Sequence, residues 1–411
     1  MYKKKIGILS NYFCAWPGGT DLIRYLLNNL ISGNTKNEYE FYLIVPRKNI
    51  KSTLKKFLYP IFFAFKKIIR FQKIEFKKWP LEIGAKFLDE YFSSNKFKNK
   101  VSILYADYSN QSKKIIKNKI DIVLPCVKTE KNTFLWIGYL FDFQHEYLPQ
   151  FFSKEEIEIR KKTMKEILFN CKHVFTNSKK TKNDAKKFYD EFPAEIHTIP
   201  YAPCIDPELT NNNEDVIKDF NLNKNYFIIC NQFWKHKNHE TAIKAFADYI
   251  KKNGDADLVL TGNTNDKRFP EHFNELKKLI SDLNLNNKVK ILGLVRKKTQ
   301  IALVRNARAL IQPTLFEGGP GGGSCRDAVS LDTEIFASDI EINKEINCGN
   351  IKFFEALNFK SLSNLLINSD KDRPEKKNFE ILTQEGESRK RNSGEFLLNI
   401  IDKAINEKFI N

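Results

Sequence analysis

Short apolar runs alternate with longer amphipathic stretches along the first half of the chain, and this alternation limits the possible folds more than any other feature. The apolar runs predict β-strands over residues 5–9, 41–45, 101–104, 120–124, 135–141 and 174–176. Amphipathic stretches at 22–30, 154–170 and 181–189 predict the helices between them. Strands that alternate with helices in this way are typical of a parallel sheet covered by helices, which is an α/β fold.

The same alternation starts again after a proline-rich segment. Residues 199–207 contain three prolines, and three asparagines follow at 211–213, which predicts a linker. Beyond it, strands are predicted over 227–230, 258–261, 289–292 and 309–312, with helices over 241–252, 276–283 and 300–306. A length of 411 residues also favours two domains. We predict an N-terminal Rossmann-like domain at 1–205, a C-terminal one at 206–385, and a helix within 386–411 that can pack back on the N-terminal domain.

Charge and hydropathy narrow the class of protein further. The formal net charge of +18 and the pI near 9.3 indicate an anionic partner, although an AT-rich genome also produces chains rich in lysine, asparagine and phenylalanine. The longest apolar run, 58–65, is far too short to span a bilayer, and the run at 6–9 is too short for the core of a signal peptide, so we expect neither. Seven scattered cysteines without a C-x-x-C pair or a histidine cluster predict reduced, mostly structural thiols.

The most distinctive motif is a glycine-rich loop that follows the predicted strand 309–312. Five glycines stand between positions 318 and 323, directly after Glu317 and before a helix that we expect to begin near Ser324. Backbone N–H groups can approach a ligand closely in such a loop, and the helix N-terminus adds the positive end of its dipole, so a diphosphate fits there. No Lys-Ser or Lys-Thr pair follows, which excludes a Walker A loop. A flexible surface loop is the alternative.

This loop and its two flanking acids resemble the signature of glycosyltransferase family 4, a retaining family with the GT-B fold. The family places two acidic residues around a shorter glycine-containing loop. Here Glu317 and Asp327 take these places with nine residues between them, and aspartate replaces the usual glutamate. The resemblance implies that Glu317 contacts hydroxyls of the donor sugar and that Asp327 contacts those of the ribose. It also implies two Rossmann-like domains that face each other across a cleft.

A second element is similar to the family's Arg-x4-Lys motif. The segment 231–239 follows a predicted strand and places Lys237 on the lysine position. In the family this lysine binds the diphosphate, and a fixed cation there stabilises the charge that builds up on the leaving group. Gln232 stands at the arginine position, so Lys235 or Arg326 is expected to supply the missing charge. A solvated surface lysine is the alternative for Lys237.

The first half of the chain adds further resemblances to the family. His145 follows an apolar run and matches a histidine that contacts the donor sugar or the reacting centre, although a lone histidine there is also a common structural hydrogen-bonding group. The predicted catalytic residues are therefore Glu317, Lys237 and His145. Gly18 and Gly19 match a glycine pair that lies near the phosphates in the family, and Val295 is expected to offer its backbone to the base. The predicted donor-binding residues are Gly18, Gly19, Gln232, Lys235, Val295, Gly318, Gly319, Gly321, Gly322, Gly323, Ser324 and Asp327.

No catalytic metal is expected. A metal-dependent glycosyltransferase of the GT-A fold needs an Asp-x-Asp motif at the end of a strand. The segment 255–257 precedes a strand and 370–372 lies in a polar tail, so both pairs are interpreted as surface charges. We therefore predict no metal and no cofactor, with a nucleotide-diphosphate sugar as the donor substrate.

A basic, aromatic stretch at 54–70 suggests contact with a membrane. Apolar side chains would share one helical face, with Lys55, Lys56, Lys66 and Lys67 on the other, which is typical of a helix at an anionic membrane surface. Pro60 predicts a helix start or a kink, and a helix packed on its own domain is the alternative. A membrane-bound enzyme would meet a lipid-linked acceptor on the same leaflet, so we expect a cytoplasmic protein held peripherally on the inner face of the membrane.

These observations predict a retaining hexosyltransferase that moves a hexose from a nucleotide-diphosphate sugar to a lipid-linked saccharide acceptor in surface glycan synthesis. A nucleotide-sugar epimerase or hydrolase of the same fold would isomerise or release the sugar without an acceptor. A single-stranded nucleic-acid-binding protein would explain the charge and the interleaved aromatic residues, but not the glycine loop with its acids, so no nucleic-acid partner is expected. A catalytically inert scaffold is a further alternative, because of Gln232 and the long spacing to Asp327.

Overall fold

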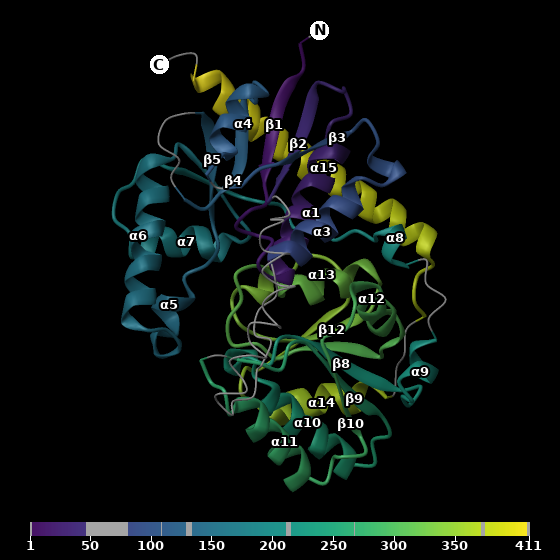
Figure 1. Ribbon diagram of the computed structural model, residues 1–411. Helices are drawn as coiled ribbons and strands as arrows, with labels where there is room; N and C mark the ends of the chain where they lie inside the picture. Colours follow the sequence, from purple (N-terminus) through teal and green to yellow (C-terminus); the bar gives the residue numbers. More distant parts are fainter. Residues whose placement is uncertain are drawn as a thin grey trace, which may run out of the picture. The chain divides into compact units, whose positions relative to one another are not determined.

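The computed structural model describes residues 2–46, 81–107, 109–128, 134–210, 215–266, 268–370 and 375–408. The predicted membrane-surface helix at 54–70 and the three asparagines at 211–213 lie outside these residues. The described part forms two sheets with helices around them (Figure 1).

A seven-stranded sheet forms in the first half of the chain, with the order β3-β2-β1-β4-β5-β6-β7. Its strands are β1 (Lys4–Leu9), β2 (Tyr39–Val45), β3 (Val101–Tyr105), β4 (Ile122–Cys126), β5 (Leu135–Leu140), β6 (His173–Thr176) and β7 (Glu195–Thr198). β1 pairs in parallel with β2 and β4, β2 with β3, and β4 with β5. The sequence did not predict β7, because its four residues, Glu-Ile-His-Thr, include a single strongly apolar side chain.

A six-stranded sheet follows, with the order β10-β9-β8-β11-β12-β13, and all five pairings are parallel. Its strands are β8 (Tyr226–Cys230), β9 (Asp257–Thr261), β10 (Val289–Gly293), β11 (Ala309–Gln312), β12 (Glu334–Ser338) and β13 (Ile351–Phe354). Counted along the chain, this is the 3-2-1-4-5-6 order of Rossmann folds. The sheets confirm the predicted α/β fold with two Rossmann-like sheets.

Helices cover both faces of the six-stranded sheet, as expected for a parallel sheet. Phe227 and Ile229 of β8 pack into one apolar cluster with residues of α10, α11 and α14. Tyr226 and Ile228, which alternate with them, pack into a second cluster with residues of α12 and α13. Figure 1 shows these two helical layers on either side of the sheet. The near-continuous apolar sequence of β8 is therefore a direct consequence of its two-sided burial.

Helices connect the strands throughout both sheets. The α-helices are α1 (Pro17–Gly33), α3 (Leu81–Phe92), α4 (Gln111–Lys117), α5 (Gln144–Tyr147), α6 (Lys154–Asn170), α7 (Lys179–Phe188), α8 (Pro207–Thr210), α9 (Val216–Asp219), α10 (His239–Lys251), α11 (His272–Asp282), α12 (Lys297–Asn306), α13 (Gly322–Ser330), α14 (Phe359–Ser369) and α15 (Phe379–Lys408). Short 3-10 helices are η1 (Asn95–Phe97), η2 (Pro149–Phe151), η3 (Lys235–Lys237) and η4 (Asn343–Glu345). No helix among the described residues has both the length and the apolar composition needed to cross a bilayer.

The chain forms two compact units, one of residues 1–139, 166–174 and 394–411 and the other of residues 140–165 and 175–393. Within the first unit, the Asp402 carboxylate near the end of α15 accepts hydrogen bonds from Lys4 Nζ and Tyr39 Oη, both at 2.7 Å. The helix predicted within 386–411 corresponds to the C-terminal part of α15, which begins earlier, at Phe379, and is described as far as Lys408. The proposed domain boundaries at 205 and 385 stay predictions.

Candidate active site

The centre of the six-stranded sheet is where a ligand site is expected. β8 and β11 are neighbours, but the chain leaves β8 toward β9 and leaves β11 toward β12, on opposite sides. In open α/β sheets the carboxyl ends of such a strand pair flank a crevice that binds ligands. η3 with Lys237 follows β8, and Glu317 follows β11. The topology therefore brings the two strongest candidates from the sequence to the same end of the sheet.

The loop that carries Lys237 is fastened to the loop that carries Glu317. Asn238 adopts the left-handed conformation, with φ of 54°, at the start of α10, and its Nδ2 donates to the Pro313 carbonyl at 3.1 Å. Its Oδ1 accepts from Thr241 Oγ1 at 3.0 Å. The Leu315 N–H donates to the His236 carbonyl at 2.8 Å. These bonds fix the backbone on either side of Lys237 against the segment that leads to Glu317.

Lys237 and Glu317 form a close ion pair through Nζ and Oε1. Their side chains are 11% and 10% exposed, so the pair is largely shielded from water. The same Oε1 atom accepts a hydrogen bond from Gln312 Nε2 at 3.2 Å. A Cβ atom on Gly322 would lie 3.2 Å from the other oxygen, Oε2. Glu317 is thus fixed through one oxygen, while the second faces the glycine loop.

Gln312, the last residue of β11, is a buried residue of this site that the sequence did not reveal. Its Nε2 donates to Glu317 and also to the Gly321 carbonyl, at 2.6 Å, and its Oε1 accepts from Asn231 Nδ2 at 2.5 Å. One amide therefore joins the ends of both strands to the carboxylate and to the glycine loop. The only signal in the sequence is a glutamine that ends an apolar strand.

The glycine loop turns into α13 at Gly322, two residues before the predicted start at Ser324. Gly321 and Gly322 have φ of 58° and 66°, which strongly favours glycine. A Cβ atom on Gly321 would also collide with Cys325. Among the described residues, no side chain caps the N-terminus of α13. The N-terminus of α13 lies beside Glu317, since a Cβ atom on Gly322 would be 3.2 Å from its Oε2 atom, and no described side chain competes there for the first N–H groups.

The first two glycines of the loop lie against the segment after β5 and the residue after β6, all within the second compact unit. A Cβ atom on Gly318 would be 3.0 Å from Asp142 Oδ2, and one on Gly319 would be 3.0 Å from Asn177 Cβ. Asp142 in turn accepts from the Gln144 N–H at 3.0 Å, at the start of the short helix α5 that carries His145. Small residues at 318 and 319 are thus required by close packing.

His145 is buried, and neither ring nitrogen has a hydrogen-bond partner among the described residues. Its ring stacks on Phe143 at 6.3 Å between centroids, and Glu146 Oε1 lies 3.5 Å from Nε2. Burial lowers the pKa of His145, so its imidazole is neutral at pH 7. The neutral ring therefore carries one donor and one acceptor, and no charge.

Asp327, on α13, is held from α12. Its Oδ2 accepts hydrogen bonds from Lys297 Nζ at 2.8 Å and from Gln300 Nε2 at 3.0 Å. No described residue donates a hydrogen bond to Oδ1. Val295, between β10 and α12, packs beside the core cluster under these helices. Asp327 thus keeps one oxygen available for a ligand.

Gln232, which stands at the arginine position, and Lys235 and Arg326, which were expected to supply the missing cation, all contact other groups. Gln232 Oε1 accepts from the Asn263 N–H at 3.0 Å and so braces the turn after β9. The Lys235 ammonium lies 5.1 Å from the ring centroid of Phe269, and the Arg326 guanidinium lies 5.9 Å from that of Tyr201. None of these contacts joins the Lys237–Glu317 pair.

Gly18 and Gly19, in the first unit, lie in the first turn of α1, which begins at Pro17, and not in a loop before it. A Cβ atom on Gly19 would be 2.7 Å from a ring carbon of Trp16. The indole therefore occupies the space beside this glycine, which gives Gly19 a packing role in the structure.

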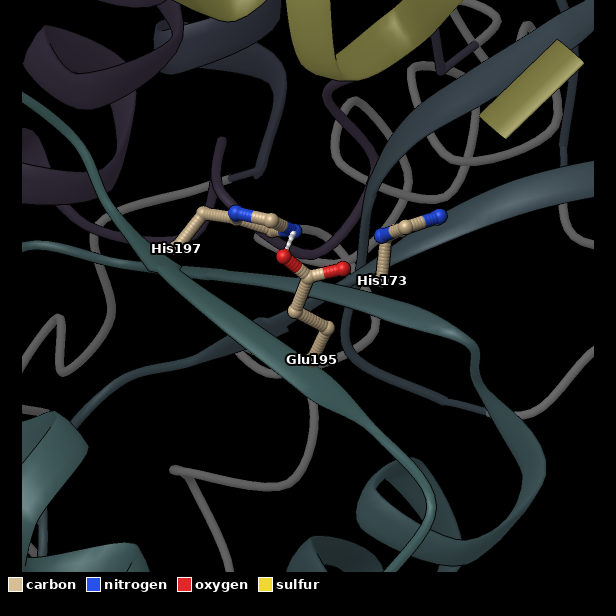
Figure 2. A group of neighbouring side chains, drawn as sticks. All are labelled: His173, Glu195 and His197. Atoms are coloured by element: carbon tan, nitrogen blue, oxygen red, sulfur yellow. Dashed lines mark ion pairs between the residues drawn. The ribbon is translucent and has the colours of Figure 1, made fainter. Parts of the chain in front are cut away.

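Figure 2 shows three potential metal ligands on strands β6 and β7. Glu195 and His197, two residues apart on β7, approach to 3.9 Å. His173 opens the neighbouring strand β6, and its Nε2 lies 2.8 Å from a carboxylate oxygen of Glu407. The group was not predicted from the sequence, because His173 lies far before Glu195 and His197 along the chain. Neither Glu317 nor Asp327 belongs to a group of potential metal ligands among the described residues.

A family model described as glycosyl transferases group 1 matches residues 211–381. This segment contains Lys237, Glu317, Asp327 and the glycine loop. The resemblance inferred from the sequence motifs is thereby confirmed over this part of the chain.

Comparison with known proteins extends the likeness beyond the family segment. The O-antigen chain mannosyltransferase RfbU of Salmonella typhimurium is 27% identical over 179 residues, which cover 43% of this chain and 44% of RfbU. The chain aligns with less than half the length of the curated relatives it matches, 44% in each case. A glycosyltransferase from Rickettsia africae has a similar crystal structure, with a TM-score of 0.59, 13% identity, and coverage of 98% of this chain and 99% of that chain.

A second similar structure is that of Anabaena HepE in complex with UDP. Its TM-score is 0.54 at 13% identity, with coverage of 99% of this chain and 98% of that chain. At such low identity the two structures show the fold alone. The group 1 segment thus lies within a chain of the GT-B fold.

Proposed function

We propose that this chain is a retaining glycosyltransferase that moves a hexose from a nucleotide-diphosphate sugar to a saccharide acceptor. The observation that carries the proposal is the shielded Lys237–Glu317 ion pair at the ends of β8 and β11, beside the uncapped N-terminus of α13. A fixed cation and a row of N–H donors suit a diphosphate, and a fixed carboxylate suits the hydroxyls of a sugar.

The donor would lie along the glycine loop. Lys237 and the N–H groups of Gly323 and Ser324 would contact the diphosphate, and Glu317 Oε2 would accept from a sugar hydroxyl. Asp327 Oδ1 would accept from the ribose, and the backbone of Val295 would meet the base. HepE was crystallised with UDP, which supports a nucleotide donor for a chain of the same fold.

Charge stabilisation by Lys237 and α13 would make a divalent cation unnecessary. The leaving diphosphate gains negative charge as the glycosidic bond breaks, and a cation fixed beside it lowers the barrier. The departing phosphate can take the acceptor proton on the same face of the sugar, which gives retention. Neutral His145 would then orient the sugar by hydrogen bonds. An NMR assignment of the new linkage and assays in excess EDTA test these points; an inverted product, or activity lost in EDTA and restored by manganese, would contradict them.

The acceptor is proposed to be lipid-linked, and the enzyme to be peripheral on the inner face of the membrane. Support comes from the basic, aromatic stretch at 54–70 and from the similarity to RfbU, an O-antigen chain mannosyltransferase. Reversal of Lys55, Lys56, Lys66 and Lys67 to glutamate should weaken co-sedimentation with anionic liposomes, at roughly 1 kcal/mol per residue. The matched control reverses four other exposed lysines to glutamate. They are Lys251 at the end of α10, Lys252 directly after it, and Lys277 and Lys278 on α11. Equal losses in both variants would reject this membrane site.

The central experiment is a thermal-shift screen against UDP-, GDP- and dTDP-sugars, followed by transfer assays with the stabilising donor. A ligand that binds only the folded protein must raise its melting temperature. Stabilisation together with transfer would support the proposal. Binding without turnover would indicate an inert scaffold, turnover without an acceptor would indicate an epimerase or hydrolase, and no binding would reject the donor site.

A further inference from the structure

We propose that Arg268, in the loop after β9, binds a phosphate group of a substrate; this inference rests on the proposed function and deepens it. The Arg268 guanidinium lies 5.3 Å from the ring centroid of Trp234 and 5.6 Å from that of Phe152. Stacking on two rings fixes the plane of the guanidinium without using its hydrogen-bond donors. Trp234 stands three residues before Lys237 on the loop that follows β8.

The two terminal nitrogens of the Arg268 guanidinium, Nη1 and Nη2, are available to bind a ligand. Its Nε lies 3.4 Å from Asp266 Oδ1, and its backbone N–H donates to the same oxygen at 3.0 Å. Within the described part of the chain, Nη1 and Nη2 make no hydrogen bond. The side chain is 25% exposed, which leaves a path to ligand. A planar fork held in this way matches a phosphate.

Arg305 shows what a stacked arginine with a structural role looks like in this fold. Its guanidinium lies 4.8 Å from the ring centroid of Phe379. Its Nη1 donates to the Leu331 carbonyl at 2.6 Å and its Nη2 to the Lys377 carbonyl at 2.9 Å. Arg305 therefore uses both outer nitrogens to hold the backbone, whereas Arg268 uses neither.

The position of Arg268 connects it to the proposed donor site. The Phe233 N–H donates to the Asn263 carbonyl at 3.0 Å, and Gln232 accepts from the Asn263 N–H, so the loops after β8 and β9 are joined. His236, the residue before Lys237, is buried, and its ring centroid lies 5.7 Å from that of Trp234. Burial, together with the positive charges of Lys237 and Arg268, lowers its pKa to about 2. Both cations are therefore close to the same imidazole.

The local charge favours an anion. Lys235, which is exposed, places its ammonium over Phe269, the residue after Arg268. Lys235, Lys237 and Arg268 contribute three positive charges, of which Glu317 balances that of Lys237 and Asp266 that of Arg268, so one positive charge is in excess. The phosphate could belong to the diphosphate of the donor or to a phosphate of a lipid-linked acceptor, since the chemistry of recognition is the same.

The test compares Arg268→Gln and Arg268→Lys with the control Arg305→Gln. Dissociation constants for UDP and GDP are measured by calorimetry, and KM values for donor and acceptor by initial rates. Loss of a charged bidentate contact should weaken binding about 10-fold in Arg268→Gln, and less in Arg268→Lys, which keeps the charge but loses the fork. Arg305→Gln should lower the melting temperature without changing these constants.

The outcomes separate the two sources of phosphate. A weaker nucleotide affinity with a raised donor KM assigns Arg268 to the donor diphosphate, and a raised acceptor KM alone assigns it to the acceptor. Unchanged constants in folded Arg268→Gln would overturn the inference, while a wild-type protein that neither binds nucleotide nor transfers sugar would overturn the proposed function instead. If Arg268→Gln fails to fold, the KM and dissociation constants of Arg268→Lys are decisive, because lysine keeps a positive charge that can lie against the two rings.

Discussion

Glu317 and Asp327 are each held by one lysine and one glutamine, but the partners are built into the fold differently. Glu317 takes Lys237 from the loop after β8 and Gln312 from the end of β11. Asp327 takes Lys297 and Gln300 from one turn of α12. In each case a single carboxylate oxygen receives both donors. The two carboxylates thus have similar hydrogen-bond donors, but the donors of Glu317 come from two separate segments and those of Asp327 from a single helix.

This difference indicates which carboxylate is coupled to the rest of the site. Gln312 is buried and also binds Asn231 and the Gly321 carbonyl, so a change at Glu317 reaches two strand ends and the glycine loop. Asp327 depends on one helix that can adjust locally. We therefore expect changes around Glu317 to be large and non-additive, and changes around Asp327 to be small and local.

The largest effect is expected from the ion pair itself. Lys237→Ala and Glu317→Ala should each lower turnover by about 100-fold with the fold intact, as for other electrostatic and orienting groups. The double variant should be little worse than either single one, because the two groups act as a unit. Initial rates and circular dichroism check this. Near-wild-type turnover in both single variants would remove Glu317 and Lys237 from the proposed site.

The glycine loop next to Glu317 should be the second most sensitive region. Gly321→Ala should destabilise the protein by about 2 kcal/mol, because φ of 58° is strained for alanine and its Cβ atom would collide with Cys325. Gly323→Ala is the matched control, since a Cβ atom there would have nothing within 4 Å. Melting temperatures decide between them. Equal shifts would show that the backbone of this loop is not conformationally constrained.

Gln312→Glu should lower turnover about 10-fold at neutral pH, in keeping with the loss of a hydrogen bond to a charged group. An ionised carboxylate would face Glu317 Oε1 and the Gly321 carbonyl where an amide now donates. Since these neighbours raise the pKa of the new carboxyl, protonation should restore the donor as the pH falls, and the defect should shrink. The pH profile of turnover relative to wild type measures this. A defect independent of pH would indicate a purely structural role for Gln312.

The smallest effect is expected beside Asp327. Lys297→Gln should raise the donor KM about 3-fold and leave kcat unchanged, because a partly exposed ion pair contributes little and Gln300 remains in place. Steady-state kinetics with varied donor test this. A loss as large as that of Lys237→Ala would mean that the two carboxylates are equally coupled to the reaction.

The central strands could be predicted because their sequences directly reflect their burial. Phe227–Cys230 and Ala309–Ile311 are apolar runs in strands covered on both faces, and they were predicted within a residue or two. β12 was missed because its buried run, Glu-Ile-Phe-Ala-Ser, has polar ends, and β13 because it is a short edge strand with exposed residues. A continuous apolar run therefore identifies a strand wherever it lies in the sheet, since the edge strands β3 and β10 were predicted and the interior strand β12 was not.

The site could be predicted in part, for a similar reason. Lys237 and Glu317 belong to sequence motifs that can be recognised without a structure, and the sheet topology brings the two residues together. Gln312 and Arg268 are single polar residues without a motif, and their roles depend on partners distant along the chain. Asn231, for example, is separated from Gln312 by 81 positions. Such pairs become visible only after the strands are in register.

The amide of Gln312 also sets a rule for engineering this protein. A library that changes donor preference would naturally vary the glycine loop and the residues around Asp327. Gln312 and Asn231 should be excluded from that library, because the amide has already committed both of its Nε2 donors and its Oε1 acceptor. Any replacement leaves at least one buried group without a hydrogen-bond partner. Variants at these two positions would therefore be lost through reduced stability before their donor preference could be measured.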